Sequence, residues 1–210
     1  MPEDELDDDL MMILSQEKIQ FHLVSRKIFD GLTTLRNPQA AIASVQRHDL
    51  EMIDLIEKRE TMLILLGVSD PGNCGNLIRT AEAFGVSKIL FHGGVDPYNP
   101  KVVRSSAGSF FRVSFSILEE SFPYVELFKE LSNFDYRSIA TSSSGGSAPE
   151  DIPTDTQIAL ILGNEPRGLP KEVEGLCDKI VTIPTEKSVE SLNVATAGAV
   201  MLYEIKRSVK

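Results

Sequence analysis

The chain has 210 residues, of which 42% are hydrophobic, enough for one medium-sized packed domain and a small accessory segment. Its formal net charge of −10 argues weakly against nucleic-acid binding through bulk charge, so any RNA contact needs a local basic patch. Cys74 and Cys177 form no CxxC pair and the histidines lack metal-ligand spacing, which predicts no disulfide framework and no metal site.

Cysteine usage and hydropathy also bear on location. Free cysteines without a pairing pattern are typical of a reducing compartment. No apolar run is long enough to cross a bilayer, and the acidic N-terminus does not resemble a signal peptide. We therefore predict a cytoplasmic protein with no membrane partner.

The first residues of the chain are strongly acidic. Their carboxylates are those of Glu3, Asp4, Glu5, Asp7, Asp8 and Asp9. Like charges in such a run repel one another and favour a solvated chain, so we predict that residues 1–14 form an acidic, disordered tail. Much of the net negative charge is therefore local.

Residues 15–60 predict a small segment ahead of the main domain. Ser25 is placed to cap a short helix that ends near Gly31, and residues 40–45 have the composition of a short strand. Residues 48–60 have the pattern of an amphipathic linker helix.

The main domain, residues 61–210, begins with a continuous apolar run that predicts a buried parallel strand over residues 62–66. Pro71, Gly72 and Gly75 then predict a tight-turn loop up to residue 76. A helix from 76 to 84 follows, and we expect Arg79 near its start, off the apolar face.

A second strand, residues 88–91, leads into the best local basic patch. Its cationic side chains are Lys101, Arg104 and Arg112, with aromatic residues interleaved. Asn99 and Pro100 predict the start of a short helix there. These cations could hold RNA phosphates, and an ordinary solvated helix face is the alternative.

Helix and strand patterns alternate through the rest of the chain. We predict helices over residues 121–134, from 170 and over 193–207, strands over 136–140, 157–162 and 179–183, and polar loops over 141–151 and 163–169. The alternation predicts an α/β fold with a mostly parallel sheet sandwiched by helices.

Three stretches together resemble a known family. They read DPGNCGNLIRTAEAFG at residues 70–85, LGNEPRGLP at 162–170 and IPTEKSVESLNVATAGAVMLYEIKR at 183–207. In order and spacing they are similar to the motifs of the SpoU/TrmH branch of the SPOUT RNA methyltransferases. The resemblance implies a deep C-terminal trefoil knot, an S-adenosylmethionine donor, a ribose 2'-hydroxyl acceptor in structured rRNA or tRNA, and a homodimer.

The resemblance extends to the segment before the main domain. Residues 24–45, VSRKIFDGLTTLRNPQAAIASV, look like the closing part of the small ribosomal-protein-like RNA-binding domain of many relatives. On this interpretation residues 15–60 are a partial or truncated RNA-binding-type segment with a linker. A helical extension packed on the main domain is the alternative.

The resemblance also implies the site residues. The catalytic set is Arg79, Asn73, Glu165, Ser191 and Asn193. The donor-binding set is Thr141, Leu162, Gly163, Ile183, Ser191 and Leu192, of which the apolar members would form the walls of an adenine slot. The RNA-binding set is the basic patch, Lys101, Arg104 and Arg112.

Arg79 matches the catalytic arginine of the family. A guanidinium is effectively never deprotonated in proteins, so a literal base role is physically unfavourable. A fork that grips the neighbouring phosphate and stabilises the developing alkoxide is easier. A surface salt bridge is the alternative for this side chain.

One stretch departs from the family pattern. The family has an IPMxG-like run, in which this chain has Thr185 and Lys187 at the Met and Gly positions. If that glycine takes a positive φ, a lysine there is strained and donor affinity falls. A catalytically idle RNA-binding module is therefore the alternative to an enzyme. A nucleotide-dependent dehydrogenase is disfavoured, because the loop after the first strand lacks GxGxxG spacing.

Overall fold

The computed structural model describes residues 1–2, 7–33, 35, 39, 41–153, 156–186 and 188–208. The chain divides into two compact units, Met1–Arg47 and His48–Lys210. The division falls ahead of the predicted domain start at residue 61. The reason is helix α3 (Met52–Glu57), whose Leu55 and Ile56 are fully buried in a core of the second unit.

The N-terminal unit begins with helix α1 (Asp8–Gln16). This helix lies partly within residues 1–14, for which the sequence predicts disorder. Asp7 accounts for the difference, because its carboxylate accepts a hydrogen bond from the Leu10 N–H at 3.0 Å and caps the helix. The part of the acidic tail that is described is therefore helical from Asp8 onward.

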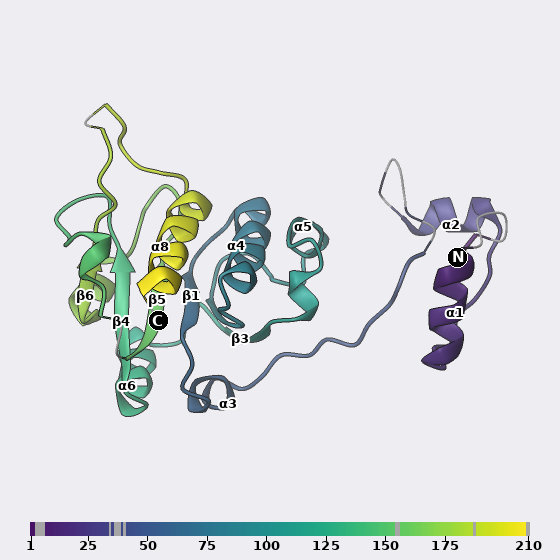
Figure 1. The fold of residues 1–210 in the computed structure, drawn as a ribbon, viewed down its shortest axis with the longest axis horizontal. Coiled ribbons are helices and arrows are strands. Elements are labelled where there is room, and N and C mark those ends of the chain that lie inside the picture. Colours follow the sequence, from purple (N-terminus) through teal and green to yellow (C-terminus); the bar gives the residue numbers. More distant parts are fainter. Residues whose placement is uncertain are drawn as a thin grey trace. The chain divides into compact units, whose positions relative to one another are not determined.

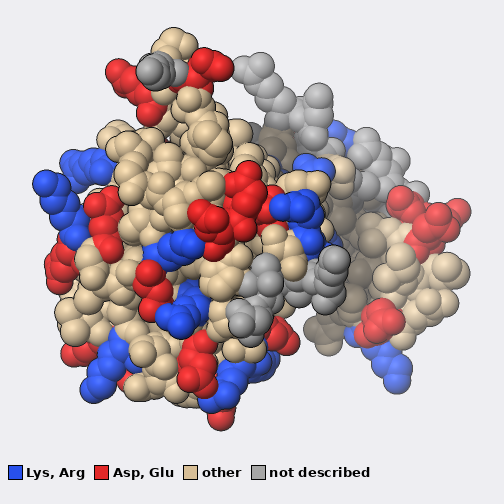
Figure 2. Space-filling model, turned by 60° about the vertical axis from the view of Figure 1, so that its left-hand side comes forward, with Lys and Arg blue, Asp and Glu red and all other residues tan. Residues whose placement is uncertain are grey.

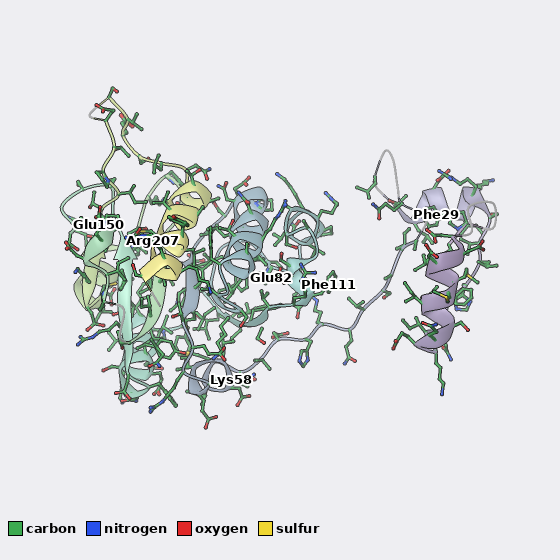
Figure 3. All side chains as sticks on the ribbon, viewed as in Figure 1. Phe29, Lys58, Glu82, Phe111, Glu150 and Arg207 are labelled. Atoms are coloured by element: carbon green, nitrogen blue, oxygen red, sulfur yellow. The ribbon has the colours of Figure 1, made fainter. Side chains whose placement is uncertain are left out.

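The rest of this unit buries little apolar surface. Helix α2 (Arg26–Leu32) follows Ser25 as predicted, but the Ser25 side chain makes no capping hydrogen bond, and residues 41–45 form no strand. Phe29, labelled in Figure 3, is only 1% exposed. Many other apolar side chains are exposed, namely those of Met12, Ile13, Ile19, Phe21, Leu23, Ile28 and Leu32. The hydrophobic stabilisation of this unit is correspondingly small.

The second unit is built on a parallel sheet (Figure 1). Its strands are β1 (Met62–Leu66), β2 (Lys88–His92), β3 (Ser114–Leu118), β4 (Tyr136–Thr141), β5 (Gln157–Leu162) and β6 (Lys179–Val181). They lie in the order β3-β2-β1-β5-β4-β6, and all neighbours pair in parallel. The predicted α/β fold with a mostly parallel sheet is confirmed.

Helices cover both faces of the sheet. One core cluster contains residues of α4 (Pro71–Ala83), α5 (Pro100–Ser105) and α8 (Val194–Ser208). The other contains residues of α3, α6 (Tyr124–Asn133) and α7 (Lys171–Leu176). Short 3-10 helices, η1 and η2, span Ser109–Phe111 and Pro149–Asp151. Helices α4 and α8 lie side by side (Figure 1).

The central strand β1 shows why a continuous apolar run forms a strand here. Leu63 and Leu65 belong to the core on the α4 and α8 side, whereas Ile64 and Leu66 belong to the core on the α6 side. Successive side chains of a strand point to opposite faces, so a strand covered on both faces is apolar at every position.

Strand β3 is absent from the sequence-based assignment. It is an edge strand in which Phe115 and Ser116 are buried while Ile117 is 37% exposed. Apolar and polar residues alternate over residues 113–117, which is a strand pattern, so this strand could have been predicted from the sequence.

Helix α4 begins earlier than the sequence predicts. Its first residue is Pro71, where a loop up to residue 76 is expected. Asp70 caps the helix by accepting from the Asn73 N–H at 2.8 Å, and proline suits the first helical position. Arg79 therefore lies in the third turn of α4, which corrects its predicted place near the helix start.

Gly75 has a packing role rather than a turn role. A Cβ atom there would lie 2.0 Å from the Ser105 Oγ and 2.5 Å from the Val102 carbonyl oxygen, both on α5. The missing side chain lets α5 approach α4 closely. The glycines of the first motif are therefore compatible with a helix that has a close neighbour.

The strand order places a crevice beside β1. From β1 the chain proceeds outward to β2 and β3, while β5, β4 and β6 extend in the other direction. Ligands bind at such switch points, outside the carboxyl ends of the strands. The loops that follow β1 and β5 are thus positioned for a site. The trefoil knot implied by the resemblance stays a prediction.

Candidate active site

The loops after β1 and β5 meet at the carboxylate of Glu165. Its Oε2 accepts hydrogen bonds from the N–H and the hydroxyl of Ser69, at 3.2 and 3.1 Å. Its Oε1 accepts from the Asp70 N–H at 3.2 Å and from the Asn73 side-chain amide at 3.0 Å. Glu165 therefore joins the first two motifs.

Asn193 of the third motif extends this arrangement. Its Nδ2 donates to the Oδ1 of Asn73 at 3.0 Å. Its Oδ1 accepts from the N–H groups of Ala195 and Thr196, at 2.8 and 3.3 Å, so that it caps α8. We call Glu165, Asn73 and Asn193 the carboxylate–amide network.

The protonation state of Glu165 determines which groups of the network donate hydrogen bonds and which accept them. Burial by itself would raise the pKa of its carboxyl, but hydrogen bonds from Asn73 and from backbone N–H groups lower it, and the net pKa lies below the ordinary value. The ionised carboxylate only accepts, so the Asn73 NH2 group must face it. The Asn73 oxygen is then left to accept from Asn193.

A cavity of about 320 Å3 opens beside Glu165. The segments after β4, β5 and β6 supply most of its lining, and the start of α8 supplies the rest. The lining includes five of the six predicted donor-binding residues, Thr141, Gly163, Ile183, Ser191 and Leu192. Segments far apart in the sequence thus converge on one concave site.

Leu162, the sixth predicted donor-binding residue, does not line the cavity. Its side chain is 0% exposed and lies in the core on the α8 side. A Cβ atom at Gly198 of α8 would lie 2.8 Å from the Leu162 Cδ1. The side chain therefore supports α8 beneath the cavity.

The loop after β5 is folded back on itself at the cavity wall. A Cβ atom at Gly163 would lie 2.7 Å from the carbonyl carbon and oxygen of Gly168, so only glycine fits this backbone approach. Asn164 ties the loop down, because its Nδ2 donates to the Gly67 carbonyl at 2.8 Å and its own carbonyl accepts from the Gly168 N–H at 2.9 Å.

The predicted catalytic residues do not all reach the cavity. Glu165 and Ser191 line the cavity. Asn73 does not line it but bonds to Glu165, and Asn193 in turn bonds to Asn73. Arg79 is exposed on α4, and its guanidinium makes no hydrogen bond or ion pair with any residue that the structure describes. The surface salt bridge considered from the sequence is therefore absent within the described chain.

The predicted basic patch contains two paired cations. The Lys101 Nζ lies 3.9 Å from Asp70, and the guanidinium of Arg112 forms a two-point ion pair with Glu82. This pairing lowers the pKa of Glu82 to about 2. Figure 3 shows Glu82 beside Phe111 of η1. Arg104 has no such partner among the residues described.

Several site residues escape the sequence analysis. Ser69 completes the cradle of Glu165, and Arg167, Glu174 and Glu190 line the cavity. Arg167 and Glu190 lie inside the quoted motifs, where their charge in a binding loop is a signal. Glu174 lies on α7, outside them, and only the packing of α7 brings it to the cavity.

Three further observations concern surface charge, metal binding and the position of Lys187. Lys and Arg side chains are interspersed with Asp and Glu on the face shown in Figure 2. Among the described residues, no group of three or more His, Cys, Asp or Glu could hold a metal ion, and no helix is long and apolar enough to cross a membrane. Lys187, at the family's glycine position, lies outside the described residues.

The chain is similar to curated RNA methyltransferases. It is 32% identical over 190 residues to the Bacillus subtilis 23S rRNA (guanosine(2553)-2'-O)-methyltransferase RlmP, covering 90% of this chain and 73% of that protein. It is 31% identical over 192 residues to a Bordetella pertussis 23S rRNA (guanosine-2'-O-)-methyltransferase, covering 89% and 77%.

Solved structures share the fold. An AdoMet-bound rRNA methyltransferase from Sinorhizobium meliloti matches with a TM-score of 0.86 and 27% identity, over 97% of this chain and 78% of that one. The SpoU methyltransferase AviRb from Streptomyces viridochromogenes, in complex with AdoMet, matches with a TM-score of 0.70 and 28% identity, over 88% and 79%. The SpoU rRNA Methylase family matches residues 60–203, and this chain therefore belongs to that family of RNA 2'-O-methyltransferases.

Proposed function

We propose that this chain transfers a methyl group from S-adenosylmethionine to a ribose 2'-hydroxyl of ribosomal RNA. The observation that carries the proposal is the convergence of the three motifs, through the carboxylate–amide network, beside a cavity of about 320 Å3. Two relatives of known structure are described with AdoMet bound, which supports the donor.

The residues of the cavity fit this donor. A volume of about 320 Å3 lies within the roughly 300–1,000 Å3 typical of ligand pockets. Leu169, Ile183 and Leu192 offer apolar surface for an adenine ring, and Thr141 and Ser142 add hydroxyl groups at the rim. When bound, the donor supplies a methyl group on a positively charged sulfonium.

In this proposal the network positions the three loops and transfers no proton. An ionised Glu165 holds Ser69 and Asp70 by their N–H groups and fixes the Asn73 amide, which in turn holds Asn193 at the start of α8. Methyl transfer needs an in-line approach of the hydroxyl and exclusion of water more than covalent help. We assign to the network the task of keeping the three loops in register.

We assign charge stabilisation to Arg79. Its guanidinium is exposed and has no partner in the described part of the chain, so it can grip the phosphate next to the reacting ribose and stabilise the alkoxide that forms there. The ribose proton then leaves to that phosphate or to water. Arg104 on the neighbouring helix α5 is a further phosphate contact in this proposal.

Ribosomal RNA is favoured over tRNA by the relatives. The proteins from Bacillus subtilis and Bordetella pertussis are named 23S rRNA methyltransferases, and so is a Streptomyces viridochromogenes protein that is 33% identical over 172 residues. The proposed location is the cytoplasm, since the named rRNA methyltransferases from Bacillus subtilis and Bordetella pertussis are bacterial proteins. We further propose that residues 15–60 form a partial or truncated RNA-binding-type segment with a linker, of which α3 packs in the core of the second unit.

We also propose that the chain acts as a homodimer through α8. Val200 and Tyr203 of this helix are 38% and 54% exposed, although other α8 residues are fully buried against the sheet. A second apolar face on one helix fits an isologous contact with a second copy. Light scattering at micromolar concentration should give twice the chain mass, and a monomer there would contradict this assembly.

The test of the function is methyl transfer from isotope-labelled S-adenosylmethionine to purified ribosomal RNA and, in parallel, to tRNA. We expect label in ribosomal RNA at one position that becomes resistant to alkaline cleavage, because a 2'-O-methyl group blocks attack by that oxygen. Donor binding by calorimetry without transfer to either RNA would favour the idle RNA-binding module instead. Label in tRNA alone would overturn the substrate assignment.

A further inference from the structure

Three charged side chains of the cavity have no partner among the residues that the structure describes. Arg167 lies on the loop after β5, Glu174 on α7 and Glu190 on the segment before α8. None of their charged groups makes a hydrogen bond or an ion pair with a residue in the part of the chain that the structure describes. The fourth charged residue of the lining, Glu165, is ionised because its pKa is lowered.

The lining therefore carries an excess of negative charge. It contains three carboxylates and a single guanidinium among the described residues. Glu165 is committed to the network, so its field is partly offset by the dipoles that donate to it. Glu174 and Glu190 have no such donors within the described ranges and present their charge to the ligand that occupies the cavity.

The donor and the spent product differ in the property that these carboxylates sense. S-adenosylmethionine carries a sulfonium with one positive charge, whereas S-adenosylhomocysteine has a neutral thioether. The adenosine and the amino-acid end are common to both. The ratio of the two affinities therefore cancels the shared contacts and isolates the effect of the charge together with one methyl group.

We infer that Glu174 and Glu190 make this cavity select the charged donor over its neutral product. The inference rests on the proposed function, since it assumes that the cavity is the donor site. Carboxylates in the lining attract the sulfonium and gain nothing from the thioether, so the product leaves more readily once the charge is gone. The two residues do not touch the reacting atoms in this scheme and set ligand preference alone.

Arg167 has the opposite effect in the same cavity. Its guanidinium opposes a cationic ligand, so its removal should increase the preference for the donor. Glu190 is exposed and Glu174 is partly buried, which makes the effect modest and sensitive to salt. Removing the carboxylates and removing the guanidinium should therefore shift the ratio of the two affinities in opposite directions.

The experiment is calorimetric titration of the full chain with S-adenosylmethionine and with S-adenosylhomocysteine, at low and at high salt. In the Glu174→Gln/Glu190→Gln variant, the ratio of product Kd to donor Kd should fall by roughly threefold to tenfold at low salt. In Arg167→Gln the ratio should rise. Glu186→Gln, an exposed change that lies outside the cavity lining, is the matched control and should leave the ratio within twofold.

The ratio also separates failure of this inference from failure of the function. An unchanged ratio in the double variant, with product binding retained, overturns the inference and leaves the enzyme assignment standing. If the double variant binds neither ligand, an unchanged ratio in both single variants overturns it equally. A wild-type chain that binds neither ligand overturns the proposed donor site itself.

Discussion

The carboxylate–amide network and the exposed cations of α4 and α5 are neighbours built in opposite ways. In the network, both oxygens of Glu165 and both ends of the Asn73 amide are engaged by protein groups. Arg79 and Arg104 have no partner among the described residues. Asn73 and Arg79 belong to the same helix, so the contrast does not arise from different scaffolds.

The difference in hydrogen bonding distinguishes groups that stabilise the folded protein from groups that are available to bind a ligand. Glu165 and Asn73 are half-buried, and a half-buried polar group is costly unless its hydrogen bonds are made, so this part of the network is a structural unit whose geometry is set before anything binds. An exposed guanidinium stays hydrated and costs little while it is unpaired. Changes in the network should therefore alter stability and donor binding, whereas changes in the unpaired cations should alter only RNA-dependent steps.

Arg79→Ala should show the largest effect. If the guanidinium stabilises charge that forms in the transition state, single-turnover methyl transfer should slow by about 10²–10³-fold. Arg79→Lys should recover only part of the rate, because an ammonium cannot form a bidentate fork. Thermal stability and donor affinity should stay at wild-type values, since the side chain has no described partner.

Near-normal transfer by Arg79→Ala would remove this residue from the mechanism, and loss of donor binding would make it structural. If the proposed dimer shares its sites, Arg79→Ala subunits mixed with Ser191→Ala/Asn193→Ala subunits should recover some activity. No recovery in a verified mixed dimer would place both sets of residues at one subunit's site.

The Ser191→Ala/Asn193→Ala pair should have the second-largest effect. Ser191 lines the cavity, and Asn193 caps α8 and holds Asn73. Donor affinity should fall by about 1–3 kcal/mol, measured by calorimetry. Loss of the cap should in addition cost about 1 kcal/mol of stability. Unchanged donor affinity in a folded variant would contradict the site assignment.

Glu165→Gln tests the network through pH. The folded-state pKa of Glu165 is lowered, so its contribution to stability is complete above the unfolded-state value, about 4.3, and is lost as the pH falls through the folded-state pKa. The variant should be less stable than wild type by about 1–2 kcal/mol at pH 7, with the gap closing in acid. Urea unfolding at several pH values measures it.

Glu119→Gln is the control for that titration, because Glu119 is exposed. Its stability should follow the wild-type curve at every pH. A gap between Glu165→Gln and wild type that persisted unchanged in acid would show that the loss comes from packing and not from the charge.

The smallest effect concerns RNA binding by the patch on α5. Arg104→Ala should weaken binding to all RNA sequences alike and reduce the slope of log Kd against log salt by roughly 0.7–0.9. Lys101→Ala and Arg112→Ala should change the slope less, because Asp70 and Glu82 already neutralise these cations. Equal effects of all three substitutions would contradict the distinction between paired and unpaired cations.

Some features of this protein follow from local sequence alone. The continuous apolar runs at residues 62–66 and 158–162 predict β1 and all but the first residue of β5, because a strand covered on both faces is apolar along its buried length. The three motifs, in their order, identify the family and the positions of Asn73, Glu165 and Asn193. These signals lie within short windows, where propensity and side-chain type dominate.

Tertiary structure decided which of those residues meet. Asn73 and Glu165 are 92 positions apart and Asn73 and Asn193 are 120 apart, and they meet because β1 and β5 are neighbours in the sheet and α8 packs beside α4. The same packing placed Glu174 in the cavity, Leu162 in the core and Arg112 against Glu82. The physical reason is that strand order and helix packing join distant segments, whereas residue propensities act over only a few positions.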